Sequence, residues 1–483
     1  MAKETDEKAY SIFDARTTAE IHQEIQQVYL ADSRPWVIGY SGGKDSTTAL
    51  QLIWYALEEL PPEQRQKPVY VITSDTLVET PVIVNYITST LERIEQKAKE
   101  TGMPFRTDIV TPEIDQTFWV NLIGKGYPAP YTKFRWCTDR MKIKPANRFI
   151  LDRVADHGEV ILILGVRKGE SSTRDQVLSL HQVKDSLLSR HTSLPNAFVY
   201  TPIVDFSVND VWIYLFQVPS PWGNDNKELF AMYRNANAGE CPLVVDETTP
   251  SCGNSRFGCW TCTVVAKDRS MEAMIDNGED WMMPMLEFRD FLASTQELET
   301  KELYREHRRR GGFVQEKDGR LIRGPYKLEF CKELLQKLLE TQQQVRQEGP
   351  DPDIELITPA ELEEIRKVWR TERQDWEDSV PQIYQEVMEE NRDWAADDLG
   401  TFTASDKAIL ESLCDDAGIP VELVAKLLDT ERQFYGMNRR ASIYDRINAI
   451  FREDWRSEET VLAELEIIRE KSETPHNVES TNS

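Results

Sequence analysis

The first 220 residues alternate between short apolar runs and longer segments with helical periodicity. The apolar runs have the length of buried strands and are bounded by proline, glycine or polar residues. They occupy residues 35–41, 68–74, 105–111, 159–166 and 197–206. The helical patterns cover residues 17–30, 45–60, 80–100 and 209–216. Strands that alternate with helices predict a doubly wound α/β domain with a mostly parallel sheet, ending near residue 220.

The pattern changes after this point. Residues 221–270 are rich in Gly, Pro, Asn and Cys and show little periodicity, which favours a loop-built region. Helical patterns follow, interrupted by a basic stretch at residues 305–327, and "GPDPD" at residues 349–353 indicates a linker. We therefore expect an α/β domain at residues 1–220, a cysteine-rich and basic region at residues 221–348, and an acidic helical C-terminal region at residues 349–483.

The formal net charge of −26 is unevenly distributed. Residues 351–483 hold 33 acidic and 15 basic side chains, whereas residues 1–350 hold 50 and 42. Nucleic-acid binding depends largely on lysine and arginine beside phosphates, so the chain is a poor DNA binder on its own. The basic stretch at residues 305–327 could approach a DNA backbone, but a solvated loop or a partner-docking surface explains it equally well.

The sequence shows no sign of a membrane or secreted protein. No run approaches the roughly 18 apolar residues that span a bilayer. The N-terminal "MAKETDEKAYSIFDA" has no apolar core of the kind found in secretory signals. We therefore expect a cytoplasmic protein without a membrane segment, and the odd count of seven cysteines does not suggest a disulfide framework.

The first apolar run leads into the loop S-G-G-K-D-S and then into a helix. A glycine-rich turn at such a position directs backbone N–H groups and the positive end of a helix toward an anion. An NTPase P-loop, G-x-x-x-x-G-K-[ST], is excluded because Ile38 stands five residues before Gly43 and Asp45 follows Lys44. The Asp45 carboxylate could reach Mg²⁺ or a ribose. The candidate nucleotide-binding residues of the loop are Ser41, Gly42, Gly43, Lys44, Asp45 and Ser46.

Further polar residues follow other strands. Asp75 comes after the second strand, at the sheet edge where open α/β sheets bind ligands. Two basic segments, "RWCTDRMKIKP" at residues 135–145 and "GVRKGESSTR" at residues 165–174, either converge on phosphates or form solvated loops. An acidic side chain in the second segment could hold an arginine in place. The candidates for nucleotide binding from both segments are Arg135, Lys142, Arg167, Glu170 and Arg174.

Four of the cysteines lie within 22 positions in the pattern C-x10-C-x6-C-x2-C. They are Cys241, Cys252, Cys259 and Cys262. Four thiolates fit either tetrahedral Zn²⁺ or a [4Fe–4S] cluster, and the presence of only one tight pair favours iron–sulfur. Cys137 lies apart and is either a sulfur acceptor or a small buried residue. Cys331 and Cys414 lie on apolar helix patterns and are expected in the core.

These motifs carry a resemblance to known families. The S-G-G-x-D-S loop resembles that of the PP-loop ATP pyrophosphatases, whose fold is adenine nucleotide alpha hydrolase-like. The R-W-C-T and G-x-R-x-x-E-S segments are similar to the phosphoadenylyl-sulfate reductase branch of that superfamily. With the cysteine segment ending "FGCWTCTVVAKDRSMEAMI" and the long helical region, the chain resembles the DndC family of bacterial DNA phosphorothioation. The motifs cover about residues 35–330.

The resemblance implies an enzyme, an ATP pyrophosphatase and sulfurtransferase, that helps to replace a non-bridging oxygen of the DNA backbone by sulfur. It implies that the loop binds the β,γ-pyrophosphate of ATP with Mg²⁺, and that the chain carries a [4Fe–4S] cluster. The implied partners are a cysteine desulfurase as sulfur donor, other DNA phosphorothioation proteins that hold DNA, and DNA as substrate. Catalytic roles are expected for Lys44, Asp45, Cys137 and Arg167.

Three other functions are compatible with parts of the pattern. A sulfonucleotide reductase is disfavoured because Cys414, the last cysteine, is followed by two aspartates instead of a histidine-containing tail motif, and because such enzymes tend to lack an intact S-G-G-x-D-S loop. A sulfurtransferase acting on tRNA is disfavoured by the acidic C-terminal region. A non-catalytic scaffold that senses ATP or redox state would show no nucleotide turnover.

Overall fold

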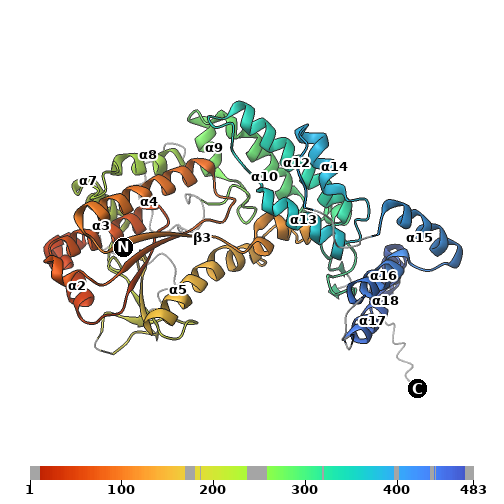
Figure 1. The fold of residues 1–483 in the computed structure, drawn as a ribbon, viewed down its shortest axis with the longest axis horizontal. Coiled ribbons are helices and arrows are strands. Elements are labelled where there is room, and N and C mark those ends of the chain that lie inside the picture. The colour runs from red at the N-terminus through yellow and green to blue at the C-terminus, as the bar shows by residue number, and fades with distance from the viewer. Residues whose placement is uncertain are drawn as a thin grey trace, which may run out of the picture. The chain divides into compact units, whose positions relative to one another are not determined.

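The computed structural model describes residues 11–168, 180–184, 186–236, 258–317, 320–395, 402–435, 440 and 442–473. The chain forms two compact units (Figure 1). The first comprises Met1–Gln116 and Pro130–Arg289, and the second comprises Thr117–Ala129 and Asp290–Ser483. The domain boundaries predicted near residues 220 and 348 stay predictions.

The first unit contains a six-stranded sheet in the order β3-β2-β1-β4-β6-β5. Every neighbouring pair is parallel except β5 and β6. The strands are β1 (Trp36–Gly39), β2 (Val69–Ser74), β3 (Phe105–Val110), β4 (Val160–Ile163), β5 (Ser189–Arg190) and β6 (Ala197–Tyr200). This confirms the predicted mostly parallel α/β fold. Because the strand order reverses between β1 and β4, the crevice outside their carboxyl ends is the expected ligand position.

Helices lie on both faces of this sheet, among them α4 (Pro81–Thr101) and α5 (Lys144–His157) (Figure 1). The other helices of the first unit are α1 (Ile12–Ala15), α2 (Thr18–Leu30), α3 (Lys44–Glu58), α7 (Val208–Gln217), α8 (Asn226–Ala236) and α9 (Arg269–Asp276). Helix α8 lies in the stretch that the sequence pattern predicts as loops. Its first residue, Asn226, is buried, and its amide donates to the carbonyls of Leu215 and Val218 at 2.9 Å each. These tertiary hydrogen bonds have no signature in local periodicity.

Successive side chains of the central strand β1 point to opposite faces of the sheet and enter two different hydrophobic clusters. Trp36 and Ile38 belong to a cluster formed with α2, α3, α4 and α7, whereas Val37 belongs to a second cluster that includes Ile150 of α5. Helix α3 is buried almost all round, and its Trp54 stacks on Phe105 with ring centroids 4.6 Å apart. Burial on both faces fixes the register of β1, and with it the position of the loop that follows.

The second unit is mainly helical. A π-helical turn, η3 (Val120–Gly124), packs near α13: the indole of Trp369 donates to the carbonyl of Ile123 at 2.9 Å. Helix α10 (Met283–Ser294) begins in the first unit, and β7 (Glu316–Lys317) and β8 (Arg320–Leu321) form a short antiparallel pair. The other helices are α11 (Lys301–Tyr304), α12 (Leu328–Glu348), α13 (Pro359–Glu372), α14 (Ser379–Met388), α15 (Ala404–Ala417), α16 (Val421–Phe434), α17 (Ile443–Phe451) and α18 (Glu458–Glu473). The predicted helical C-terminal region is confirmed.

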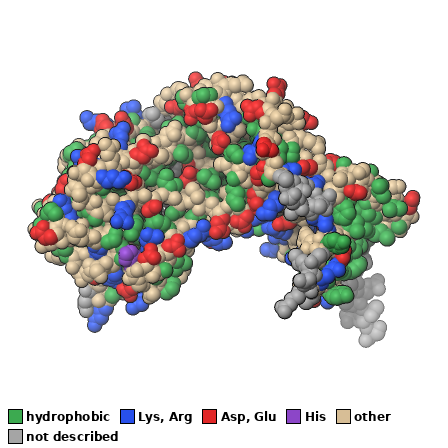
Figure 2. Space-filling model, viewed as in Figure 1, with side chains coloured by type: hydrophobic (Ala, Val, Ile, Leu, Met, Phe, Trp, Pro, Cys, Tyr) green, Lys and Arg blue, Asp and Glu red, His purple; other side chains and the backbone are tan. Residues whose placement is uncertain are grey.

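The surface carries charges of both signs. Acidic and basic side chains are interspersed over the face drawn in Figure 2. Within the described residues, no helix is both long enough and apolar enough to cross a bilayer.

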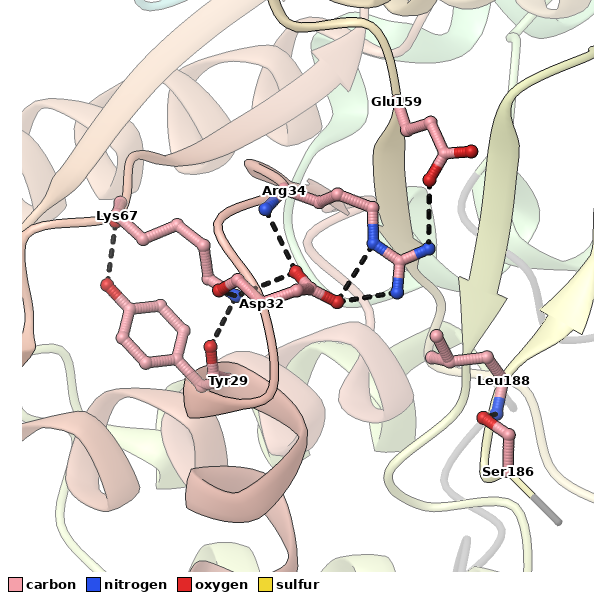
Figure 3. Close-up of polar contacts among 7 residues, drawn as sticks. All are labelled: Tyr29, Asp32, Arg34, Lys67, Glu159, Ser186 and Leu188. Carbon is pink, nitrogen blue, oxygen red and sulfur yellow. Dashed lines mark hydrogen bonds and ion pairs between the residues drawn. The ribbon is translucent and has the colours of Figure 1, made fainter.

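A buried lysine ties α2 to β2 at the sheet edge opposite the β1–α3 loop (Figure 3). The Lys67 ammonium donates to the Tyr29 carbonyl at 2.5 Å and lies 3.7 Å from the Asp32 carboxylate. The Tyr29 hydroxyl donates back to the Lys67 carbonyl at 2.7 Å. Arg34 contacts both Asp32 and Glu159, at 2.9 and 3.3 Å. Burial lowers the pKa of Lys67 to about 8.

This lysine makes stability depend on pH. In the unfolded chain Lys67 binds its proton up to about pH 10.5, so between about pH 8 and about pH 10 the unfolded state holds more protons and stability rises with pH. We expect the thermal unfolding temperature of the first unit to gain less over this range in Lys67→Met than in the wild-type protein. An identical pH profile for the two proteins would show that folding does not shift the pKa of Lys67.

Candidate active site

The loop between β1 and α3 has the conformation that its glycines permit. Gly42 has a φ of +69°, and a Cβ there would lie 2.7 Å from Cγ1 of Ile87. The Ser41 N–H donates to the Ser46 hydroxyl at 3.2 Å, and that hydroxyl donates to the Gly43 carbonyl at 3.0 Å. The loop is therefore closed by its own serines, with the Ser41 side chain at the surface.

Helix α3 begins directly after the loop. Its N-cap is Gly43, which provides no side-chain cap, and its 15 residues direct their combined dipole toward the loop. An uncapped helix N-terminus leaves backbone donors for a ligand, and phosphate is a suitable one. The turn is therefore built as an anion-binding element.

Three charged side chains meet at this turn. The Asp45 carboxylate accepts from the Lys44 ammonium at 2.9 Å and from Nε of Arg167 at 2.7 Å. Arg167 is buried and comes from the segment after β4, so residues 122 positions apart in the sequence are brought together. Arg167, from the segment after β4, therefore lies beside the loop that carries Lys44 and Asp45, and its role in binding phosphate stays a prediction.

Gly165 is a site residue that the sequence pattern did not single out. A Cβ on Gly165 would lie 2.8 Å from the carbonyl carbon and oxygen of Asp45 and 2.9 Å from the Ser46 nitrogen. These are backbone atoms, so they cannot rotate away. The segment after β4 therefore packs directly against the first turn of α3, and only glycine permits the approach.

We expect Gly165→Ala to weaken ATP binding about tenfold or more, because the start of α3 must move and small displacements at such sites are costly. The control is Gly124→Ala in the second unit, since a Cβ there approaches nothing closer than the Ile365 Cγ1 atom at 3.4 Å. Calorimetric titration with ATP checks both variants. Equal affinities for Gly165→Ala and the wild-type protein would contradict the role assigned to this contact.

A pocket of about 300 Å³ lies beside the loop, at the carboxyl ends of three strands. Its lining includes Gly39 and Ser41 from the end of β1, Ser74 from β2, and Leu164 after β4. Asp75 follows immediately, but its carboxylate accepts from the Leu77 N–H at 2.8 Å within its own turn. Burial, with a smaller contribution from Glu79, raises the pKa of Asp75. The pocket has the size and place expected for the sugar and base of a nucleotide.

Glu79 connects this pocket to the cysteines. It lines the pocket, and its carboxylate accepts from the Lys142 ammonium at 3.1 Å and from the Thr76 hydroxyl at 3.0 Å. The Cys259 thiol donates to the same oxygen at 3.7 Å and lies 3.4 Å from the Thr76 hydroxyl. Burial and Glu79 raise the pKa of Cys259. Nothing in the sequence singles out Glu79, because a glutamate after a strand is common.

The other thiols of this region lie near the same place. Cys262 follows in one turn, in which its N–H donates to the Cys259 carbonyl at 3.0 Å. Burial raises the pKa of Cys137, and the nearby Cys262 thiol adds to the effect. The fully buried Arg289 donates to the carbonyls of Cys262 and Ala266 at 2.9 and 3.0 Å, which fixes the segment after the pair. Cys137 is therefore close enough to Cys262 for the two thiols to interact electrostatically.

The remaining predictions have mixed outcomes. Arg135 is exposed. Glu170, Arg174, Cys241 and Cys252 lie outside the described residues. Within the described chain, no three His, Cys, Asp or Glu side chains are placed to hold one metal ion. Cys331 and Cys414 are buried, as expected.

Two arginines of the basic stretch at residues 305–327 form ion pairs with acidic residues of their own unit. Arg308 pairs with Glu422, and Arg323 pairs with Glu458. The Arg308 guanidinium also lies 4.9 Å from the centre of the Trp455 ring. These contacts are made within the second unit, so the DNA-facing, solvated-loop and partner-docking interpretations all stay predictions.

Comparisons with known proteins agree with this geometry. Residues 35–265 match the phosphoadenosine phosphosulfate reductase domain. The chain contains a PP-loop domain similar to that of phosphoadenosine phosphosulfate reductases. Residues 406–452 match a small protein found in certain Dnd DNA modification systems. This second match covers α15 to α17, a segment whose sequence pattern shows only acidic and helical character.

Individual relatives are distant. An uncharacterized protein of Methanocaldococcus jannaschii is 27% identical over 198 residues, which are 41% of this chain and 35% of that protein. The match thus spans about a third of its length. A phosphoadenylyl-sulfate reductase from Candida auris, solved with phosphate, is 16% identical with a TM-score of 0.29, covering 44% of this chain and 85% of that one. The U34-tRNA thiolase of Methanococcus maripaludis, solved with its [4Fe–4S] cluster, is 16% identical with a TM-score of 0.26, covering 60% and 82%.

Proposed function

We propose that the chain uses ATP to activate a phosphate of the DNA backbone, so that sulfur replaces a non-bridging oxygen. The observation that carries this proposal is the position of Glu79, which lines the pocket beside the phosphate-binding loop and also contacts Cys259. Glu79 thus connects the wall of this pocket with the thiol of Cys259. The matches to the phosphoadenosine phosphosulfate reductase domain and to a small protein of Dnd systems support the same function.

Activation is needed because a phosphodiester oxygen is a very poor leaving group. Transfer of AMP to that oxygen forms one P–O bond and breaks the bond between the α- and β-phosphates of ATP, so that pyrophosphate leaves. A sulfur nucleophile then attacks the activated phosphorus and expels AMP. We assign the pyrophosphate to the loop at residues 41–46, where the N-terminus of α3 and Lys44 stabilise its charge.

Mg²⁺ fits this arrangement through Asp45. In nucleotide sites Mg²⁺ is usually held by one or two carboxylates together with the substrate phosphates. Asp45 stands at the loop with 18% of its side chain exposed. Because its two oxygens are paired with Lys44 and Arg167, Mg²⁺ would use their remaining lone pairs. The metal ion supplies charge neutralisation for the phosphates when it is bound.

A [4Fe–4S] cluster fits the described thiols in part. Cys259 and Cys262 form the tight pair that such sites use, and the buried Arg289 holds the segment that follows. We propose that Cys241 and Cys252 complete the ligand set, and that Cys137 accepts sulfur for transfer. The cluster supplies redox or sulfur-carrying chemistry when it is bound.

DNA reaches this site with the help of partners. The chain is strongly acidic, and Arg308 and Arg323 of the basic stretch are already paired with carboxylates. We therefore propose that other DNA phosphorothioation proteins hold the DNA and that a cysteine desulfurase delivers the sulfur. Both roles are consistent with the match of residues 406–452 to a Dnd-system protein.

The proposal is tested by reconstitution. The purified chain, a cysteine desulfurase with cysteine, the other phosphorothioation proteins, ATP and duplex DNA are incubated without oxygen. Mass spectrometry of the digested DNA is expected to show sulfur-containing dinucleotides only when ATP is present. Sulfur in added tRNA but not in DNA would replace this proposal by a tRNA sulfurtransferase, and sulfur incorporation without ATP would contradict the activation step.

A further inference from the structure

A tyrosine from α8 reaches the phosphate-binding loop. The Tyr233 hydroxyl accepts a hydrogen bond from the Lys44 N–H at 3.2 Å. A Cβ on Gly43 would lie 2.9 Å from the same hydroxyl oxygen. The Tyr233 hydroxyl therefore leaves no room for a side chain at position 43, and it lies over the first amide of α3.

Two further contacts hold this side chain. The Lys44 ammonium lies 5.3 Å from the centre of the Tyr233 ring, within the range of a cation–π interaction. The ring also packs edge-on against Trp212 of α7, with centroids 5.3 Å apart and an interplanar angle of 82°. Trp212 is fully buried, so the position of the tyrosine ring is set by the core. Packing of the ring on Trp212 therefore fixes the position of the hydroxyl at the loop.

The first amides of a helix are the donors that a bound phosphate uses. A hydroxyl group that accepts from one of them can also donate to a bound phosphate, because a phenol is donor and acceptor at once. Lys44 N–H, the Tyr233 hydroxyl and a phosphate oxygen can therefore form one chain of hydrogen bonds. An alanine at position 43 would interrupt it.

The geometry points to Tyr233 as a positioning residue for the outer phosphates of ATP, which donates its hydroxyl proton to the pyrophosphate group. This inference rests on the proposed function, since it names a further residue of the same site. A contact to the pyrophosphate exists both before and after the α–β bond breaks. Its loss therefore weakens binding of substrate and product alike and leaves the chemical step unchanged.

The test is Tyr233→Phe, which removes only the hydroxyl. We expect KM for ATP to rise about tenfold, kcat to stay within about twofold, and binding of inorganic pyrophosphate to weaken by a similar factor as KM. The matched control is Tyr55→Phe, which removes a hydroxyl on α3 that donates to the Pro219 carbonyl at 2.8 Å, outside the loop. That variant is expected to keep the wild-type values.

The opposite outcomes are equally clear. Unchanged pyrophosphate affinity in Tyr233→Phe would overturn the inference, and tighter binding would show that the hydroxyl blocks the site. A fall in kcat with an unchanged KM would also overturn it, because the hydroxyl would then act only in the transition state. Failure of the proposed function is seen separately, as the absence of AMP and pyrophosphate with the wild-type chain.

Discussion

Asp45→Asn is expected to lower kcat/KM for pyrophosphate release by about 100-fold or more. The carboxylate joins the Lys44 ammonium and the Arg167 guanidinium, at 2.9 and 2.7 Å. An amide of the same shape lacks the charge that orders both cations and that binds Mg²⁺ in the proposed complex. The cations then lose their fixed positions at the phosphate-binding loop. Release of labelled pyrophosphate from ATP, with the partner proteins present, measures the effect.

The control for this variant is Asp205→Asn. Asp205 pairs with Lys168, the residue after Arg167, at 2.5 Å. This pair is exposed and lies away from the loop. Exposed pairs contribute little, so activity is expected to stay within about twofold. Normal pyrophosphate release by Asp45→Asn would remove the loop from the mechanism. Equal losses in both variants would point to a general effect of charge near β4.

Cys259→Ser is expected to reduce bound iron from about four atoms per chain to a trace after anaerobic purification. A serine hydroxyl is a poor ligand for the soft iron–sulfur centre. ATP binding is expected to be unchanged, because the thiol contacts Glu79 and Thr76 and not the phosphate-binding loop. Incorporation of sulfur into DNA is expected to be lost. Iron and sulfide analysis reports on the cysteine pair, and titration with ATP reports separately on the nucleotide-binding loop.

The matched control is Cys414→Ser. This cysteine is also buried, but it packs with Trp376, Leu410 and Ala425 in a core of the second unit. It is expected to retain full iron. Full iron in Cys259→Ser, or an equal loss in Cys414→Ser, would contradict the assignment of the Cys-x-x-Cys pair.

The sequence predicted the parallel sheet of the first unit and the loop after its first strand, but not β5, α5 or α8. Its strands are short, apolar and separated by helices, and the glycines of residues 41–46 fall between a strand and a helix, where their conformational freedom is needed. The meeting of Asp45 with Arg167 could be predicted as well, because both follow neighbouring parallel strands. Order along the chain and order in the sheet are linked by simple rules in such folds.

The residues that the sequence did not reveal act through tertiary contacts. Gly165 is required by the backbone of Asp45, and Tyr233 reaches the loop from a helix whose position depends on the buried side chain of Asn226. The position of Glu79 is set by an antiparallel backbone bridge to Cys259, 180 residues later in the sequence. Gly165 opens the G-x-R-x-x-E-S motif, but the motif does not say what the glycine packs against, and the contacts of Tyr233 and Glu79 have no local periodicity or motif.

The central claim is that the loop holds the outer two phosphates of ATP while the inner one is transferred. The most direct measurement follows ATP labelled at the α-phosphate, in the presence of the partner proteins and DNA. The account predicts that the label appears in AMP and that pyrophosphate is released in equal amount. Label in ADP, with orthophosphate as the other product, would contradict it.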